Sequence, residues 1–313
     1  MLIENWTKKE WDIFVKTSPQ GDIFCQSCFL GSYNQPIKYL RCSRGEETLA
    51  GFAFIESAKQ IRSMPFQGYS GIIFKDFSNL TPYHRNLIVF SVLSAFAEYL
   101  FSHYDQVIFN NHWEIIDMRP FDWLNYHQRE KGYFKISVRY TSHLDISNPD
   151  DTSGYARLRT RDLKREEKGV KFSTKESDDI ELLSYLHGQN FKRQGIKRKK
   201  TEIYFLKRIC ENLIQAKSGK LFVTYVNQKP AVSSFFIFDR FRAYHLFVGA
   251  DLHFRYLGVG TKNFFDCCQF LNKILGLKEV DMGGINSPLR GSYKLSYGGK
   301  IVPYYNIEKV SAE

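Results

Sequence analysis

Arg255-Tyr256-Leu257-Gly258-Val259-Gly260-Thr261 places two glycines between an apolar segment and a helix-patterned one. Residues 242–250 are apolar and aromatic, which predicts a strand, and residues 261–275 carry apolar side chains at helical spacing. A loop between a strand and a helix N-terminus brings together unpaired amides and the positive end of the helix dipole. Because Gly258 and Gly260 lack Cβ, a phosphate could approach this backbone closely. The loop predicts an anion site, with a plain tight turn as the alternative interpretation.

The composition indicates more than one domain and an anionic partner. The chain has 313 residues, a 43% apolar fraction and a formal net charge of +11. Nucleic acid, a membrane surface and a phosphorylated small molecule all fit that sign. Much of the excess charge lies in residues 157–171 and 192–200, for which a solvated helix end or loop is the alternative interpretation.

The cysteines and the apolar segments bear on the cellular compartment. Cys25-x-x-Cys28 stands without a second pair, so we expect reduced thiols and no metal. Residues 1–10 lack a basic-then-apolar signal pattern. The most apolar window, residues 87–101, is interrupted by polar side chains and is short for a membrane span. We therefore expect a cytoplasmic protein without a membrane span.

The segments of the second half follow a regular order around the loop. The patterns predict a strand over 170–177, helices over 179–193 and 200–215, and a hairpin of strands over 220–227 and 230–239. The strand before the loop follows over 242–250, then the helix after the loop over 261–275 and a late strand over 278–282. Polar turn formers at Asn227-Gln228-Lys229 close the hairpin.

The first half repeats this order without the loop. Thr7-Lys8-Lys9-Glu10 has the form of a capping box that opens a short helix. Strands over 35–42, 48–57 and 72–74, a long helix over 80–104, and strands over 105–110 and 133–144 follow. Turn formers at residues 148–154 lack apolar periodicity and predict a boundary there, which gives domains 1–150 and 151–313.

The loop has the Arg/Gln-x-x-Gly-x-Gly/Ala form of the coenzyme A pyrophosphate loop of GNAT acyltransferases, and the order of elements over residues 155–310 resembles that family. Two such halves resemble the tandem-GNAT, Fem-like acyltransferase superfamily, closest to the nucleotide-linked sugar N-acyltransferases of bacterial surface-polysaccharide biosynthesis. Three further segments carry the likeness: Asp117-Met118-Arg119-Pro120-Phe121-x-Trp123, Val280-Asp281-Met282-Gly283-Gly284-Ile285-Asn286 and Tyr293-Lys294-Leu295-Ser296-Tyr297-Gly298-Gly299. The resemblance implies an α/β (α+β) chain of two tandem GNAT-like domains, each a twisted mixed sheet flanked by helices.

The resemblance also implies coenzyme A as cofactor and assigns residues to it. Backbone amides of the strand before the loop would polarise the thioester carbonyl, and the loop would hold the pyrophosphate; these residues are Phe247, Val248, Gly249, Arg255, Tyr256, Leu257, Gly258, Val259, Gly260 and Thr261. A tyrosine after the late strand would protonate the departing thiolate, and Tyr293 is preferred to Tyr297. Simple strand pairing and a packed tyrosine are the respective alternatives.

Acyl transfer to an amine also needs the amine to be neutral. His245 and Asp281 are the candidate bases, on two strands expected to splay around the coenzyme. His245 has a suitable ordinary pKa, with a packed core histidine as the alternative. Asp281 would need a raised pKa or a bridging water, and capping the turn at Gly283-Gly284 is its alternative.

The acceptor is expected between the halves, where pockets concentrate. The candidate substrate-binding residues are Gln26, Tyr69, Asn190, Asn286 and Lys294, with Ser27, Asn110, Asn111 and His112 as further candidates. We assign Lys294 to a phosphate, because a lysine needs a strong pKa shift to be neutral at pH 7. Each of the others is more often a surface or turn residue.

The leading hypothesis is an N-acyltransferase that uses acyl-coenzyme A and a nucleotide-linked amino sugar, such as a dTDP-aminodideoxyhexose. Fem-type bridge ligases use aminoacyl-tRNA, lack an intact pyrophosphate loop and commonly insert a coiled-coil arm, whereas this sequence keeps the loop and has no heptad insertion. An aminoacyl-tRNA-dependent peptidoglycan-bridge ligase, with the runs near Lys164 and Lys197 facing RNA, is the same-fold alternative. A non-catalytic GNAT-fold interaction protein is the third. The acyl group, the sugar and the oligomeric state stay open.

Overall fold

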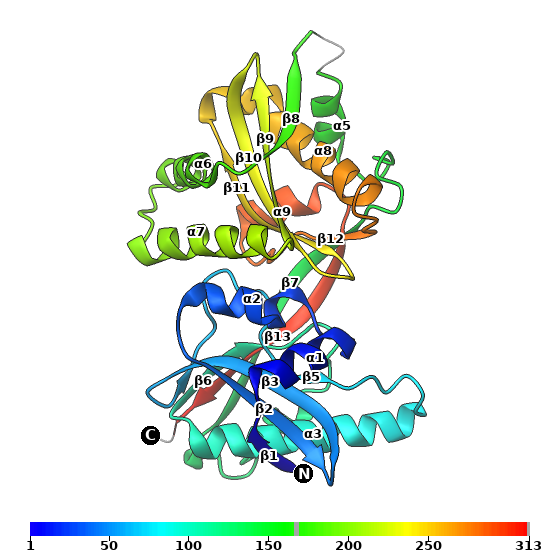
Figure 1. Ribbon diagram of the computed structural model, residues 1–313, viewed down its shortest axis with the longest axis vertical. Coiled ribbons are helices and arrows are strands. Elements are labelled where there is room, and N and C mark those ends of the chain that lie inside the picture. Colours follow the sequence, from blue (N-terminus) through cyan, green and yellow to red (C-terminus); the bar gives the residue numbers. More distant parts are fainter. Residues whose placement is uncertain (166–168, 312–313) are drawn as a thin grey trace. The chain divides into compact units, whose positions relative to one another are not determined.

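The computed structural model describes residues 1–165 and 169–311 and divides the chain into two compact units (Figure 1). Unit 1 comprises Met1–Arg139 and Pro303–Glu313, and unit 2 comprises Tyr140–Val302. This division differs from the expected boundary at residue 150. Strand β7 (Tyr133–Asp145) runs across it, and strand β13 (Lys300–Val310) returns the chain to unit 1. The turn-forming residues 148–154 follow the end of β7. They therefore lie later in the chain than the division between the two units at residues 139 and 140.

Unit 1 is a mixed sheet. Its strands run in the order β1-β2-β3-β4-β6-β13, with β5 paired to β3. The pairs are antiparallel except for the parallel pair of β4 with β6. The bounds are β1 Leu2–Asn5, β2 Ile37–Arg44, β3 Glu47–Ser57, β4 Gln60–Ile61, β5 Ile73–Phe74 and β6 Gln106–Asn110; the α-helices are α1 Lys8–Thr17, α2 Ser27–Leu30, α3 Pro82–His103 and α4 Arg119–Asp122.

Helices cover both faces of the unit 1 sheet because alternate strand residues point to opposite faces. Phe52 joins the cluster that contains Phe96 of α3, whereas its neighbour Ala53 joins the cluster that contains Trp11 of α1. Thr7 caps α1 in the predicted capping box with Glu10, so that prediction is confirmed.

Helix α3 is long and apolar enough to cross a membrane by length and composition. A buried helix of an ordinary domain core meets the same criteria, and α3 buries Val92, Leu93, Phe96, Ala97 and Leu100 in unit 1.

Unit 2 holds strands in the order β7-β12-β11-β10-β9-β8. Strands β11 and β12 are parallel, and the other neighbours are antiparallel. Helices α6 and α7 lie on one face of this sheet, and α5 and α8 lie on the other (Figure 1). The bounds are β8 Phe172–Ser177, β9 Gly219–Val226, β10 Lys229–Phe238, β11 Ala243–Ala250, β12 Glu279–Asp281, α5 Arg157–Leu163, α6 Ile180–Arg193, α7 Lys200–Gln215, α8 Val259–Lys273 and α9 Pro288–Leu295.

The long elements of both units lie where the apolar periodicity predicts them, and the α/β fold class is confirmed. The patterns do not predict α5 or α9. Helix α9 has eight residues and includes Gly291, which suits a close approach: a Cβ on Gly291 would lie 2.7 Å from the carbonyl oxygen of Ile285. Part of the basic run at residues 157–171, namely 166–168, lies outside the described residues.

Candidate functional site

The glycine loop connects β11 to α8 through a short 3-10 helix, η5 (Leu252–Leu257). Gly258 has a φ of 73°, in the left-handed region that favours glycine. A Cβ at Gly258 would lie 2.6 Å from the Cγ of Asp162. The first glycine is therefore required by the turn and by close packing against α5.

The second glycine faces open space. Among the residues that the structure describes, the amides of Val259 and Gly260 have no hydrogen-bond acceptor, and Gly258 provides no side-chain cap. Among the described residues outside its own helix turn, the hydroxyl oxygen of Tyr293 alone comes within 4 Å of a Cβ placed on Gly260, at 3.5 Å. Two unpaired amides at the start of a 15-residue helix, beside an uncrowded glycine, suit an anion.

Asp162 of α5 lies on the Gly258 side of this helix N-terminus. Its Oδ2 accepts a hydrogen bond from Thr261 Oγ1 at 3.0 Å and lies 3.4 Å from Arg159 Nη1. Arg159 also donates to Thr261 Oγ1 at 3.1 Å and to Ser296 Oγ at 2.8 Å. The buried carboxylate is thus balanced by a neighbouring guanidinium, and it leaves the Gly260 side open.

Two tyrosines of the α9 region complete this group. The hydroxyls of Tyr293 and Tyr297 are 2.9 Å apart, and the Arg159 guanidinium lies 4.5 Å and 5.2 Å from the two ring centroids. Burial raises the pKa of Tyr297 well above its ordinary value, so Tyr297 keeps its proton. Tyr293 therefore presents a hydroxyl, held by Tyr297, to the open side of Gly260.

Strands β11 and β12 pair at only two positions among the described residues, Ala243 with Val280 and Tyr244 with Asp281. Strand β11 then continues along β10 with a bulge opposite Phe235 and Phe236, so the two parallel strands separate beyond Tyr244. Phe247, Val248 and Gly249 lie in the separated part of β11.

This part of β11 is closely packed by α6. A Cβ on Gly249 would overlap the backbone of Leu186 and His187, so glycine allows α6 to approach the strand. Asn190, a predicted substrate contact, donates from Nδ2 to the carbonyl oxygen of Val248 at 3.0 Å. In this structure Asn190 therefore joins α6 to β11.

Asp281 ends β12 within a polar cluster. It accepts hydrogen bonds from Thr141 Oγ1 and, at 2.7 Å, from the amide of Gly283, and its Oδ2 lies 3.4 Å from His143 Nε2. Asp281 thus caps the glycine turn, as the alternative interpretation of this residue predicts. Its carboxylate also lies beside the imidazole of His143.

The charge of Lys294 acts on both Asp281 and His245. His245 is buried and stacks on Phe236 with ring centroids 4.5 Å apart, and its Nε2 has no hydrogen-bond partner among the described residues. Burial, with a smaller effect of the Lys294 charge, lowers the pKa of His245 to about 3. Burial also lowers the pKa of Lys294 to about 8, against the opposing effect of Asp281. At pH 7 the imidazole is neutral, and the Lys294 amine is mostly charged and donates to Gly284 O at 3.1 Å.

The pKa of His245 predicts loss of stability in acid. Its folded-state value of about 3 lies below the ordinary 6.5, so the unfolded chain binds the proton first as the pH falls through 6.5. Between pH 7 and pH 5 this should lower the free energy of unfolding by about 2 kcal/mol. Denaturant titrations of His245→Phe should show a pH dependence smaller by that amount. Phe235→Leu, which loses core packing against Phe247 and not against His245, should keep the full dependence; an unchanged dependence in His245→Phe would contradict the assignment.

The other predicted substrate contacts have packing or hydrogen-bond partners within their own units. Tyr69 is 3% exposed and packs edge-on against Phe24 and Tyr304 within unit 1. Gln26, also in unit 1, accepts from the thiol of Cys28. Asn286 of unit 2 exchanges two hydrogen bonds with the backbone of Tyr140, at 2.8 Å and 3.0 Å.

Four residues of the site are absent from the sequence-based prediction: Thr141, His143, Arg159 and Asp162. Thr141 and His143 belong to β7, far from Asp281 in the sequence. Arg159 and Asp162 lie three apart on α5, a spacing that places two side chains on one helix face. That spacing is the sequence feature that points to Arg159 and Asp162 as a pair, and it falls within the basic run at residues 157–171.

Comparison with known proteins agrees with this architecture. Residues 153–295 match the family model described as acetyltransferase (GNAT) domain. Similar solved structures include FemX, with 12% identity, 97% of each chain covered and a TM-score of 0.67. A tandem GNAT protein from the clavulanic acid biosynthesis pathway has 9% identity, covers 100% of this chain and 98% of its own, and has a TM-score of 0.57. L-PGS from Bacillus licheniformis has 15% identity, coverage of 97% and 92%, and a TM-score of 0.52. No curated protein matches the chain. The chain therefore has a tandem-GNAT, Fem-like fold.

Proposed function

We propose that this tandem-GNAT chain is a cytoplasmic N-acyltransferase that moves an acyl group from acyl-coenzyme A to the amine of a nucleotide-linked amino sugar in surface-polysaccharide biosynthesis. The observation that supports acyl-coenzyme A as the donor is the pair of unpaired amides, Val259 and Gly260, at the start of α8. Such amides, together with the helix dipole, bind phosphate oxygens. The net charge of +11 and the family resemblance support the phosphorylated acceptor.

The proposed reaction forms a carbon–nitrogen bond and breaks the carbon–sulfur bond of the thioester. Amides of the separated part of β11, from Phe247 to Gly249, polarise the thioester carbonyl. Tyr293 gives its proton to the departing thiolate, beside the open face of Gly260.

The proton of the attacking amine goes to Asp281 through water. His245 orients the acceptor as a neutral hydrogen-bonding group, because an imidazole with a pKa of about 3 is too weak a base for an amine. Lys294 remains available to an anionic group of the acceptor at pH 7.

Turnover tests the proposal. The protein is incubated with acetyl- or hydroxyacyl-coenzyme A and a panel of dTDP- and UDP-linked amino sugars, and free thiol is followed. We expect thiol release that depends on the sugar amine. Absence of turnover across the panel, with coenzyme A binding intact, would remove the sugar assignment and leave the donor assignment standing.

An aminoacyl-tRNA-dependent ligase is the second candidate. The similarity of fold to FemX favours it, as does the exposed basic segment at residues 192–200. Phosphate contacts make RNA binding fall steeply with salt. Under our proposal, filter binding of tRNA should be weak at about 150 mM salt and should show no competition with coenzyme A. Tight, salt-dependent tRNA binding that displaces coenzyme A would favour the ligase.

A further inference from the structure

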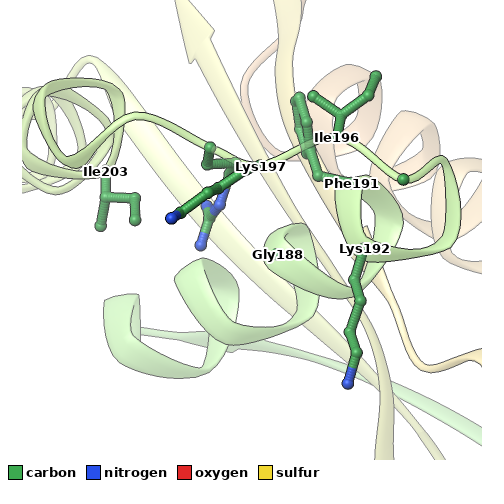
Figure 2. A pocket seen from close by; sticks show the side chains of 8 residues that line it. Gly188, Phe191, Lys192, Ile196, Lys197 and Ile203 are labelled. Carbon is green, nitrogen blue, oxygen red and sulfur yellow. The ribbon is translucent and has the colours of Figure 1, made fainter.

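Unit 2 contains a hollow that the proposed donor site does not use. Its volume is about 500 Å³, and Figure 2 shows its side chains coming from the end of α6, the connecting loop and the start of α7. The lining residues are Gly188, Phe191, Lys192, Gly195, Ile196, Lys197, Arg198 and Ile203. These described lining residues combine three cations with three apolar side chains and include no carboxylate.

Arg198 is fixed before any ligand arrives. Its guanidinium lies 3.0 Å from His187 Nδ1 and donates to the carbonyl oxygen of Ser184 at 2.9 Å. Burial, aided by the charges of Arg198 and Arg290, lowers the pKa of His187 to about 4, so the neutral ring accepts from the guanidinium. A held guanidinium loses little side-chain entropy when it binds an anion.

Gly188 makes this arrangement possible. A Cβ on Gly188 would lie 2.9 Å from Arg198 Nη2, so a larger residue would displace the guanidinium from α6. The glycine thus offers a way to disturb the hollow without removing a charge.

A further cation lies between the hollow and the candidate catalytic group. The Arg290 guanidinium of α9 lies 5.7 Å from the ring centroid of Phe191, and its charge also lowers the pKa of Lys294. Positive groups therefore extend from Lys197 and Arg198, past Phe191 and Arg290, toward Lys294. Lys294 in turn interacts electrostatically with Asp281, so this series of charges connects the hollow with the candidate catalytic group.

We propose that the hollow between α6 and α7 binds the nucleotide part of the acceptor, namely its diphosphate and its flat base. The three cations of the lining bind the phosphate oxygens. The Phe191, Ile196 and Ile203 side chains pack against the base. The proposal rests on the proposed function, because it places the acceptor of that reaction. The size of the hollow suits a nucleotide, whereas RNA binding would draw on cations over a wider surface.

The test uses uridine diphosphate as a soluble probe and farnesyl diphosphate as a lipid-linked one, each titrated by calorimetry. Lys192→Ala/Lys197→Ala should weaken binding of the preferred probe by about tenfold or more, since each charge-assisted contact is worth roughly a power of ten. Gly188→Ala should weaken it in the same direction. Lys229→Ala/Lys278→Ala removes two exposed charges of unit 2 outside the hollow and should change affinity less than about twofold.

We expect uridine diphosphate to bind more tightly than farnesyl diphosphate and to depend on the hollow, because farnesyl diphosphate has no flat base to pack against Phe191, Ile196 and Ile203; a preference for farnesyl diphosphate would overturn the assignment of a nucleotide. The proposal is overturned if neither probe binds the parent protein, if the control pair weakens binding as much, or if tRNA binding alone depends on Lys192 and Lys197. Parallel titrations with coenzyme A separate the two proposals. If coenzyme A binds but probe binding is unaffected by the substitutions in the hollow, this inference fails and the proposed donor site stands. If probe binding depends on the hollow but coenzyme A does not bind, this inference stands and the proposed donor site fails.

Discussion

Replacing Gly260 with aspartate is expected to weaken coenzyme A binding by about a hundredfold while leaving the protein at least as stable as the parent. A Cβ has room at this position, because among the described residues outside its own helix turn Tyr293 Oη alone lies within 4 Å of it, at 3.5 Å. A carboxylate in the first turn of α8 favours the helix, and aspartate is also a better helix former than glycine. The same charge repels a pyrophosphate at the amides of Val259 and Gly260.

Calorimetric titration with coenzyme A and a thermal melt measure the two effects separately. Arg255→Ala is the matched control, because Arg255 is exposed and its loss should weaken binding by only about threefold. Substitutions of Gly258 are unsuitable, since the left-handed φ and the contact with Asp162 would disturb folding. If Gly260→Asp bound coenzyme A as tightly as the parent, the donor would have to bind elsewhere.

Replacing Tyr293 with phenylalanine should lower kcat by about a hundredfold or more and leave coenzyme A binding unchanged. The ring keeps its packing beneath the Arg159 guanidinium and against Tyr297, so the hydroxyl alone is lost. A thiolate that departs without a proton is a poor leaving group, which makes the effect one of turnover and not of affinity.

Tyr155→Phe is the matched control for this change. Tyr155 packs edge-on against Tyr297, with ring centroids 5.3 Å apart, in the same aromatic group. Its hydroxyl is assigned no part in the reaction, so kcat should stay within about twofold of the parent. A Tyr293→Phe variant with more than half of the parent kcat would assign the proton to another donor.

The long elements of this fold follow from the sequence because their apolar side chains repeat at the strand or helix period. The predicted helix at residues 200–215 is α7 with those same bounds, and the hairpin around Asn227-Gln228-Lys229 is β9 and β10. Helices α5 and α9 could not be predicted in this way, because seven or eight residues carry too few apolar positions to define a period.

The candidate site was predictable to the extent that its residues lie on long elements. The loop, His245 and Asp281 lie on or beside periodic segments, and the structure places Lys294 where its charge acts on both His245 and Asp281, and Tyr293 near Gly260. Burial could not be deduced from sequence, and it is burial that makes His245 a weak base. The contacts of Arg159 and Asp162 with Thr261 depend on how α5 packs, which no local pattern encodes.

The amide signal of Gly260 offers the most direct test of the donor site. Val–Gly pairs occur twice in the chain, at 248–249 and 259–260, so labelling valine with carbonyl ¹³C and glycine with ¹⁵N gives two selectable amide signals. Gly260→Asp removes one of them and so assigns both. The account predicts that coenzyme A moves the Gly260 signal downfield in a saturable manner, as its amide bonds to the pyrophosphate. A Gly260 signal that does not move while coenzyme A saturates the protein would contradict it.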